Sequence, residues 1–555
     1  MDPSDPRLTF GHFLRDITAR HAQRTAVVFG ERHISYAELE AEARVLARAL
    51  LAAGVGKGSR VAVWMGNRPE WIVSAFAVTM LGGVLVPVST FASGTELTHI
   101  LRHSDASMLL MQPTLERHRL LDALLEALPE IGTARPGPLF TPVMPYLRRV
   151  VSLGEPVPPA AGVEPLAALL AGADEVDDAL LDAASAQVHP SDEGVLVYTS
   201  GTTALPKGVL HNQRAAILQA WRFAELLRFD AEDRVYTTYP FFWTAGIAMS
   251  IGGAFAAGAR LLLQEIFEAS QALDMIESER ATAVHAWPHQ QKALGEHPSA
   301  SARDLSSVRK VDFSAPIAKL AGVERDEYGA GASYGLSETF TLASALPADA
   351  PAAERHACSG RPLAGNALRI VDPESGEPLP VGVEGEIAVK GPTLMRGYYK
   401  VLPERVFDAD GFFRSQDAGS LDADGRLHWT GRLSNLIKTG GANVSPVEIQ
   451  ELLEGHPQLK IAIALGVGHP TLGEALILCA VAVEGADLAE DSLRAWLRER
   501  LAAYKVPRRV LFFRSDELSY TANQKVQTEP LREAARLRLV AEGAEIEGYR
   551  YTAEG

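Results

Sequence analysis

The chain has 555 residues, more than one hydrophobic core usually serves, so we expect at least two domains. Hydrophobic residues make up 47% and charged residues 22%, which is the balance of an ordinary globular protein. The 53 basic and 69 acidic side chains give a net charge of -16, which excludes a nucleic acid bound by bulk charge.

The first part of the chain alternates short apolar runs with segments of helical periodicity. We predict a helix over 36–53, a strand over 61–65, a helix over 70–81 and a strand over 83–88. The same alternation recurs over 101–111 and 209–263. Alternating strands and helices are typical of a layered α/β fold with a parallel sheet.

Later stretches differ from this pattern. Residues 127–190 are rich in Ala, Pro and Gly, and we interpret them as a loop excursion with one or two helices. Residues 366–391 alternate apolar and polar positions between turn residues, which predicts antiparallel strands. Beyond Arg432 we expect a small α+β domain, with strands over 435–440, 461–468, 477–485 and 510–513 and helices from 446 and near 491–503.

The sequence gives no sign of export or of membrane insertion. The segment MDPSDPRLTFGHF has no basic region followed by an apolar core, and no apolar run reaches about 18 residues. The two cysteines, Cys358 and Cys479, have neither metal-site nor disulfide spacing. We therefore predict a cytoplasmic protein without a membrane span.

The strongest local signal is the segment YTSGTTALPKG at 198–208, directly after a strand-like run. Glycines let the backbone approach a ligand, amides and hydroxyls donate to phosphate oxygens, and Lys207 supplies a positive charge. An exposed Ser/Thr-rich turn is the simpler interpretation of such a run. The segment is not a P-loop of the GxxxxGK[ST] type, because no hydroxyl residue follows the lysine.

This segment resembles the phosphate loop of the adenylate-forming superfamily, which includes acyl- and aryl-CoA ligases, amino-acid adenylation domains and firefly-type luciferases. Further motifs follow in that family's order between about residues 10 and 540: YPFFWTAG (239–246), SAP (314–316), SYGLSET (333–339), GEIAVKGPTLMRGYYK (385–400), GFFRSQD (411–417), GRLSNLIKTGGANVSPVEIQ (431–450) and YTANQKV (520–526). Eight motifs in register exclude a chance match.

The resemblance implies a role for particular residues. In SYGLSET, Tyr334 would stack on adenine, Ser337 would contact the α-phosphate, and Glu338 would bind magnesium, with Thr199 as a second ligand. A hard divalent cation beside phosphates needs only one or two protein oxygens, which agrees with this assignment. The remaining candidates for contact with nucleotide or coenzyme A are Ser200, Gly201, Thr202, Thr203, Lys207, Ser314, Ala315, Ser333, Gly335, Asp417, Arg432, Lys438, Gly440 and Gly441.

The resemblance further implies how some of these residues act. Asp417 would bind the ribose hydroxyls with help from Arg432. Lys525 matches the catalytic lysine that stabilises negative charge as the acyl-adenylate forms. Ser434 falls at the hinge about which the small domain turns, and Gly440 and Gly441 would let pantetheine pass close to the backbone.

The implied fold is α/β, with a large layered N-terminal domain and a small, mobile C-terminal α+β domain. We place the first over 1–432, the second over 433–545 and a tail over 546–555. The implied reaction joins a carboxylic acid to coenzyme A through an acyl-adenylate, with ATP converted to AMP. Magnesium is the expected metal.

The region of YPFFWTAG limits the class of carboxylic acid that the enzyme would use as substrate. It holds no acidic side chain, so the ammonium group of an amino acid would be buried there without a partner. Phe241, Phe242 and Trp243, with the Gly/Ala-rich stretch 251–259, predict an apolar pocket for a medium or bulky lipophilic acid. The alternative is that these aromatic residues belong to the plain core.

Several positions depart from the family's pattern. Ala204 and Gln524 stand where glycines are usual, Ser415-Gln416 replaces Thr-Gly, Ser519 replaces a common Pro, and Trp243 replaces a common His. Most of these positions belong to the adenylation side. One alternative is therefore an enzyme that thioesterifies an acyl-adenylate supplied by a companion adenylating enzyme.

Three other functions also fit the resemblance. An acyl-AMP ligase would load the acyl group onto a carrier protein instead of free coenzyme A. A luciferase-like monooxygenase would share the fold and the adenylation step. A non-catalytic nucleotide-binding regulator would need neither Lys525 nor Glu338.

Overall fold

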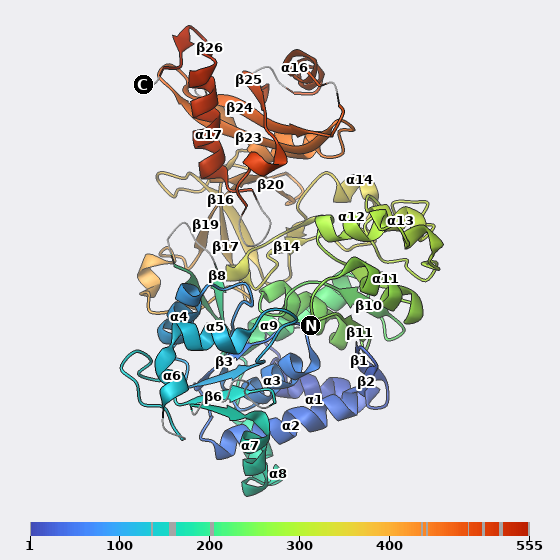
Figure 1. Cartoon of the computed structure of the whole chain (residues 1–555), viewed down its shortest axis with the longest axis vertical. Coiled ribbons are helices and arrows are strands. Elements are labelled where there is room, and N and C mark those ends of the chain that lie inside the picture. Colours follow the sequence, from blue (N-terminus) through green and yellow to red (C-terminus); the bar gives the residue numbers. More distant parts are fainter. Residues whose placement is uncertain are drawn as a thin grey trace. The chain divides into compact units, whose positions relative to one another are not determined.

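The computed structural model describes residues 2–134, 137–154, 162–199, 205–433, 437–439, 442–486, 488–501, 505–520 and 526–552. It divides into two compact units, whose helices and strands are labelled in Figure 1. The first comprises Met1–Leu368, Ala388–Arg414 and Asp424–Leu427, and the second comprises Arg369–Ile387, Ser415–Ala423 and His428–Gly555. Within the described ranges, no helix combines the length and apolar character that crossing a membrane requires.

An eight-stranded sheet forms the centre of the first unit, with the strand order β18-β9-β8-β4-β3-β5-β6-β7. The bounds are β3 Arg60–Trp64, β4 Val84–Pro87, β5 Met108–Met111, β6 Arg149–Ser152, β7 Val163–Pro165, β8 Glu193–Thr199, β9 Lys207–Asn212 and β18 Gly397–Tyr398. Strand β3 pairs in parallel with β4 and β5, whereas β8 and β9 are antiparallel. The strands predicted over 61–65 and 83–88 are confirmed as β3 and β4.

Residues 127–190 contribute more to this sheet than the sequence predicted. They contain the helices α6 (Pro129–Thr133), α7 (Leu166–Leu170) and α8 (Asp178–Ala186). They also contain β6 and β7, which extend the parallel sheet beyond β5. The interpretation as a loop excursion was wrong here, because strands of four and three residues are too short to show a periodicity between Pro- and Gly-rich segments.

Different helices cover the two faces of the eight-stranded sheet. Val61 and Val63 of β3 lie in a core with α1 (Phe10–His21), α2 (Tyr36–Ala52), α3 (Pro69–Met80) and α9 (Gln213–Leu226). Ala62 and Trp64 lie in a separate core with α4 (Gly94–His103) and α5 (Leu120–Ala127). Successive side chains of a strand point to opposite faces, so an unbroken apolar run is what a sheet covered on both sides requires. The helices predicted over 36–53 and 70–81 are confirmed as α2 and α3.

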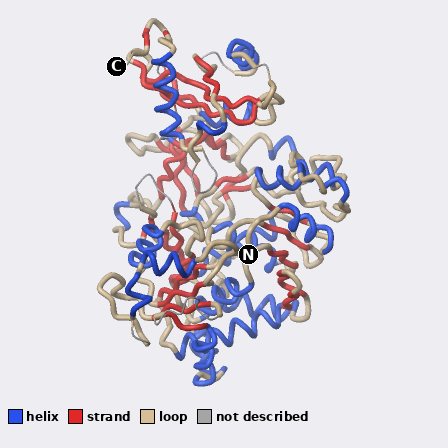
Figure 2. The backbone as a smooth tube through the Cα atoms, in the orientation of Figure 1, coloured by secondary structure: helices blue, strands red, loops and turns tan. Residues whose placement is uncertain are grey.

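A second sheet has the strand order β12-β10-β11-β1-β2. It packs on the layer formed by α1, α2, α3 and α9. Its strands are β1 Thr25–Phe29, β2 Arg32–Ser35, β10 Arg234–Thr237, β11 Arg260–Leu263 and β12 Ala283–His285. Val27 and Val235 share the core of Val61, so that helical layer lies between two sheets. Val28 and Tyr236 face the outer helices α11 (Ala269–Ser278), α12 (Pro288–Glu296) and α13 (Pro316–Leu320). Figure 2 shows these strands and helices along the chain.

Shorter elements complete the first unit and lead into the second. They are η1 Ala171–Glu175, the π-helical η2 Gly246–Gly253, α10 Ala254–Ala256, η3 Ala300–Ala302, β13 Ser333–Tyr334, η4 Ser337–Thr339, β14 Ser344–Ala345, α14 Ala352–Arg355, β15 Arg361–Pro362, β16 Ala367–Val371, β17 Gly385–Lys390, η5 Pro403–Arg405, β19 Phe413–Leu421 and β20 Leu427–Arg432. Strands β16 and β17 confirm that strands occupy 366–391, and they are neighbours in the sheet β16-β17-β19-β20.

The C-terminal part of the second unit surrounds a sheet in the order β22-β21-β24-β23, with β25 paired to β24. Its elements are β21 Ile437–Thr439, β22 Ala442–Val444, α15 Pro446–Leu453, β23 Leu459–His469, β24 Gly473–Ala482, α16 Glu490–Arg498, β25 Arg509–Phe512, η8 Ser515–Glu517, α17 Thr528–Ala541, β26 Glu545–Ile546 and β27 Tyr549–Arg550. Helix α17 packs on one face, and α15 and α16 pack on the other. The helix from Pro446 is confirmed, and the one predicted near 491–503 ends earlier, at Arg498.

Candidate active site

The loop that follows β13 carries Ser337 and Glu338 in a tightly constrained backbone. A Cβ atom on Gly335 would lie 1.8 Å from the carbonyl oxygen of Thr341, so glycine alone fits at this position. Phe340 and Thr341 have φ angles of 49° and 91°, which side chains with a Cβ rarely adopt. Such a conformation persists only where the surroundings impose it.

Two buried side chains from neighbouring elements hold this loop. The Nε2 atom of His211, in β9, donates to the carbonyl of Ser337 over 2.7 Å. The side-chain amide of Gln219, in α9, donates to the carbonyls of Thr339 and Leu342 over 3.1 and 2.7 Å. Burial lowers the pKa of His211 from 6.5 to about 4, so the imidazole is neutral at neutral pH and its one N–H serves the loop.

Glu338 is held at two points by the segment that ends in β18. Its backbone carbonyl accepts from the amide of Met395 over 2.7 Å, and its Oε1 atom accepts from the hydroxyl of Tyr398, also over 2.7 Å. The ammonium group of Lys207 lies over the ring of Tyr398, 5.4 Å from its centroid. Lys207 and Glu338, both predicted from the sequence, therefore contact one tyrosine.

The phosphate-loop candidates fall at the end of β8 and beyond it. Thr199 is the last residue of β8 and pairs with Lys207 across the ladder to β9. The other candidates of this loop, Ser200, Gly201, Thr202 and Thr203, lie outside the described residues, as do Ser434, Gly440, Gly441 and Lys525.

The remaining candidates of the first unit are found on short segments. Ser314 is exposed, and Ala315 is buried directly before α13. Ser333 donates its hydroxyl to the carbonyl of Ala330 over 3.3 Å. Tyr334 pairs with Ser344 in the small sheet β13-β14-β15, and its side chain is largely buried.

In the second unit, Asp417 and Arg432 form an ion pair with Nε and Oδ1 3.0 Å apart. Arg432 also donates to the carbonyl of Ser415 over 2.9 Å. The hydroxyl of Ser415 donates to the carbonyl of Ile387 and accepts from the amide of Asp417. Gln416 has a φ angle of 62°, and its backbone N–H donates to the carboxylate of Glu386 over 2.8 Å. A residue with a left-handed backbone conformation therefore stands in β19 directly before Asp417.

Lys438 lies in β21 of the second unit, and its side chain is exposed. Its backbone amide donates to the carboxylate of Glu474 over 2.8 Å.

Phe242 and Trp243 belong to an aromatic cluster formed from separate loops. Trp243 contacts Phe242 and Trp287 with ring centroids 5.4 and 5.9 Å apart, and Trp287 also packs edge-to-face on Tyr239 at 4.6 Å. Phe242 is buried under the exposed ring of Phe91, whereas Trp243 is half-buried. The cluster therefore presents Trp243 at the edge of an apolar region.

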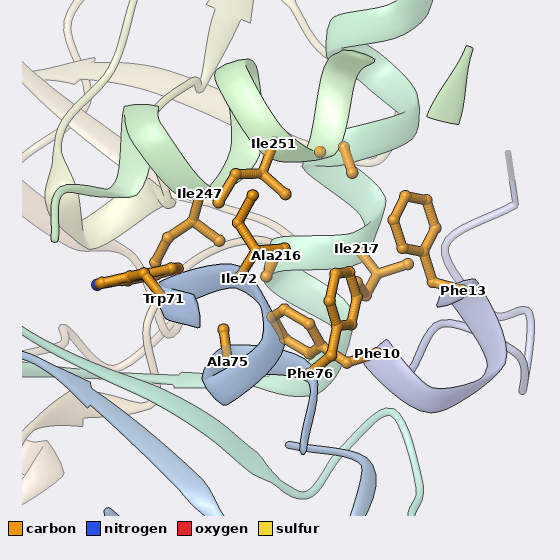
Figure 3. A pocket seen from close by; sticks show the side chains of 12 residues that line it. Phe10, Phe13, Trp71, Ile72, Ala75, Phe76, Ala216, Ile217, Ile247 and Ile251 are labelled. Atoms are coloured by element: carbon orange, nitrogen blue, oxygen red, sulfur yellow. The ribbon is translucent and has the colours of Figure 1, made fainter. Parts of the chain in front are cut away.

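Two glycines of the stretch 251–259, Gly252 and Gly253, serve helix packing. A Cβ atom on Gly252 would lie 2.6 Å from the Cβ atom of Ala220 in α9, and one on Gly253 would lie 3.1 Å from that of Phe223. A small, almost entirely apolar cavity of about 20 Å³ lies beside them, lined by Phe10, Phe76, Trp71, Ile217, Ile247 and Ile251 among others (Figure 3). Neither Phe242 nor Trp243 lines it. These two glycines therefore allow close contact between η2 and α9.

Among the described residues, no group of three or more His, Cys, Asp or Glu side chains forms a metal site. Glu338 offers a carboxylate and Thr199 a hydroxyl, both hard oxygen donors. This small donor set fits magnesium held chiefly by phosphates and water.

Comparison with known protein families shows to which family this chain belongs. The AMP-binding enzyme model matches residues 14–399, and the model for its C-terminal domain matches residues 448–525. The chain belongs to the AMP-binding enzyme family. It has the α/β adenylate-forming fold, with a large N-terminal and a small C-terminal domain, and it is an acid–thiol ligase of the AMP-forming acyl-CoA synthetase group.

Three similar proteins illustrate this family. Indoleacetate–CoA ligase of Aromatoleum aromaticum is 32% identical over 515 residues, 92% of this chain and 95% of that protein. The structure of the anthranilate CoA ligase AuaEII in complex with anthranoyl-AMP has a TM-score of 0.79 and 25% identity, covering 97% of this chain and 99% of its own. ATP-bound MatB of Rhodopseudomonas palustris has a TM-score of 0.76 and 26% identity, with 95% and 99% coverage. Family membership and the ATP-bound neighbour support ATP as the nucleotide.

Sequence reasoning missed four side chains that shape this site in an AMP-binding enzyme. His211, Gln219 and Tyr398 contact the loop of Glu338, and Trp287 packs on Trp243. Tyr398 stands within a motif quoted above, and His211 follows the phosphate loop by only a few residues. A histidine directly after the apolar pair Val209-Leu210 is the signal that could have indicated a specific hydrogen bond.

Proposed function

We propose that this enzyme joins a medium or bulky lipophilic carboxylic acid to coenzyme A through an acyl-adenylate. The observation that carries the proposal is that Glu338 and Lys207 both contact Tyr398, Glu338 at the hydroxyl and Lys207 over the ring. A carboxylate suited to a divalent cation and an ammonium group suited to phosphate thus lie in one region.

The first unit would bind the phosphates and the adenine. Tyr334 stacks on adenine, Ser337 contacts the α-phosphate and Lys207 the outer phosphates. Glu338 and Thr199 hold magnesium, which when bound neutralises charge on the phosphates. The nucleotide also contacts Ser314, Ala315, Ser333 and Gly335, and its phosphates are surrounded by residues 200–203. The ribose is assigned to Asp417, whose carboxylate is kept in place by Arg432.

Two steps follow from this arrangement. A carboxylate oxygen of the acid attacks the α-phosphorus of ATP, the bond to the β-phosphate oxygen breaks, and pyrophosphate leaves. Lys525 supplies a positive charge where the negative charge develops. The thiolate of coenzyme A then attacks the acyl carbon, and AMP leaves with the electron pair of the broken bond.

The second step is assigned to the C-terminal domain. We place that domain over 433–545 and its hinge at Ser434, so that it moves between the two half-reactions. Lys438 and the glycines 440 and 441 contact coenzyme A. Free thiols at Cys358 and Cys479 agree with a reducing, cytoplasmic location.

The aromatic cluster around Trp243 supports a lipophilic acid. Trp243, Phe242 and Trp287 offer apolar ring surface, and YPFFWTAG contains no acid that would pair with an amine. Indoleacetate–CoA ligase and the anthranilate CoA ligase AuaEII, by their names, use aromatic acids. An aryl or alicyclic acid is therefore the first class to test.

The deciding experiment measures thioester formation from ATP, magnesium, coenzyme A and a panel of aryl, alicyclic and fatty acids. We expect Glu338→Gln to lower the rate with ATP about a hundredfold, the loss of one metal contact, and to spare the reaction of a preformed acyl-adenylate. Glu404→Gln, at an exposed carboxylate, should behave as the wild type. An equal loss in both reactions would make Glu338 structural, and absence of thioester with every acid would refute the function.

A further inference from the structure

The backbone brings Tyr398 to the same face as Lys207. Strand β18 pairs antiparallel with β9, so that Tyr398 lies opposite Val209. The hydrogen bonds Arg396 N to Leu210 O and Tyr399 N to Gly208 O, both 2.7 Å, close the ladder on either side. Lys207 stands two residues before Val209 and shares its face, which makes Lys207 and Tyr398 diagonal neighbours.

The hydroxyl of the same tyrosine reaches the opposite charge. It donates to Oε1 of Glu338 over 2.7 Å, and the backbone of Glu338 is fixed by Met395 three residues before Tyr398. A hydrogen bond to a carboxylate orients it and leaves its second oxygen for another partner. The face of an aromatic ring attracts an ammonium group without removing its charge.

We infer that Tyr398 is a positioning residue that keeps Lys207 and Glu338 apart and correctly oriented before ATP binds. The inference rests on the proposed function, because it assigns phosphate to Lys207 and magnesium to Glu338. A direct Lys207–Glu338 ion pair would occupy the two groups that the nucleotide needs. Tyr398 instead gives each group a partner of its own, because its ring contacts the ammonium group and its hydroxyl holds the carboxylate.

Two variants separate the ring from the hydroxyl. Tyr398→Phe removes the hydroxyl that donates to Glu338 and keeps the ring, whereas Tyr398→Leu also removes the ring below Lys207. Tyr399→Phe is the matched control, because the hydroxyl of Tyr399 donates to Asp105 over 2.7 Å and to neither site residue. Circular dichroism and thermal unfolding check that each variant folds.

The readout is calorimetric binding of ATP without the acid, measured with magnesium and with a chelator. For Tyr398→Phe we expect the gain in affinity that magnesium brings to shrink about tenfold, the effect of one lost hydrogen bond to a charged group. Its metal-free affinity should be unchanged. Tyr398→Leu should lower both affinities, since Lys207 is then free to pair with Glu338.

A full magnesium effect in Tyr398→Phe, equal to that of Tyr399→Phe, would overturn the inference and leave the proposed function intact. If Tyr398→Leu does not fold, Tyr398→Phe alone decides. If the wild-type enzyme binds no ATP with or without magnesium, the proposed function fails and this inference fails with it. In the double variant with Glu338→Gln, Tyr398→Phe should add nothing to the loss of the magnesium effect.

Discussion

The Nε2 atom of His211 lies 2.7 Å from the carbonyl oxygen of Ser337, and this contact ties the strand after the phosphate loop to the loop that carries Glu338. A carbonyl only accepts, so Nε2 must carry the proton. His211 is fully buried and packs edge-to-face on Phe340, the left-handed residue of the same loop. One neutral side chain thus supports both the strained backbone and the candidate catalytic residues.

The first prediction concerns the acid sensitivity that His211 brings. Its pKa is about 4 in the folded chain, against 6.5 when solvated. Between these values the unfolded chain binds a proton that the folded chain does not, so stability falls as the pH drops through this window. His211→Gln keeps a hydrogen-bond donor but does not titrate. Between pH 7 and pH 4.5, its free energy of unfolding, measured with urea, should therefore fall by about 2 kcal/mol less than that of the wild type.

His189→Gln is the control for this effect, because that imidazole is exposed. It should keep the pH dependence of the wild type. An unchanged pH dependence in His211→Gln would mean that folding does not lower the pKa of His211, which would contradict the prediction.

The second prediction compares two glycines four positions apart. Gly335→Ala places a Cβ atom 1.8 Å from the carbonyl oxygen of Thr341, whereas nothing lies within 4 Å of the corresponding atom on Gly331. We expect Gly335→Ala to destabilise the enzyme by about 2 kcal/mol or more and to weaken ATP binding, as the loop must move. Gly331→Ala should unfold as the wild type does. Equal behaviour of the two variants in thermal unfolding would contradict the packing seen around Gly335.

The third prediction uses the left-handed backbone of Gln416. Its φ of 62° is costly for a residue with a Cβ atom, and its side chain is exposed. Gln416→Gly should therefore stabilise the second unit by about 0.5–1 kcal/mol after the entropic cost of glycine, measured by chemical unfolding. Gln416→Ala removes the same side chain but keeps the strain, so it should gain nothing. Stabilisation by both variants would locate the cause in the side chain.

The fourth prediction tests whether adenylation is intact. Gln416 shows that the left-handed backbone before Asp417 forms without glycine, at the cost of strain. The wild-type enzyme should therefore form thioester from acid, ATP and coenzyme A at a rate comparable to that from synthetic acyl-adenylate and coenzyme A. Product from the adenylate alone would instead identify an enzyme that depends on a companion adenylating enzyme, and Ala204→Gly or Gln524→Gly should then restore adenylation. A phosphopantetheinyl carrier protein as acceptor separates a carrier-loading ligase in the same assay.

The sequence alone determined the family, the layered fold and the order of the main elements. The helix α2 and the strand β3 could be predicted because their apolar periodicity is local, and a motif such as SYGLSET keeps its spacing whatever surrounds it. Strands β6 and β7 and the helix α17 were not predicted. The two strands gain their stability from neighbours in the sheet, which a segment of three or four residues does not reveal.

The tertiary structure alone decided how the site residues are held. Tyr398 and Lys207 are far apart in the sequence, yet the β9–β18 ladder makes them neighbours, and Tyr398 thereby reaches Glu338. His211 and Gln219 likewise reach the loop after β13 only because β9 and α9 lie against it in the folded chain. Motif spacing is set within one segment of chain. Hydrogen bonds and ring contacts between segments depend on the register in which those segments pair, and that register is fixed only when the whole core packs.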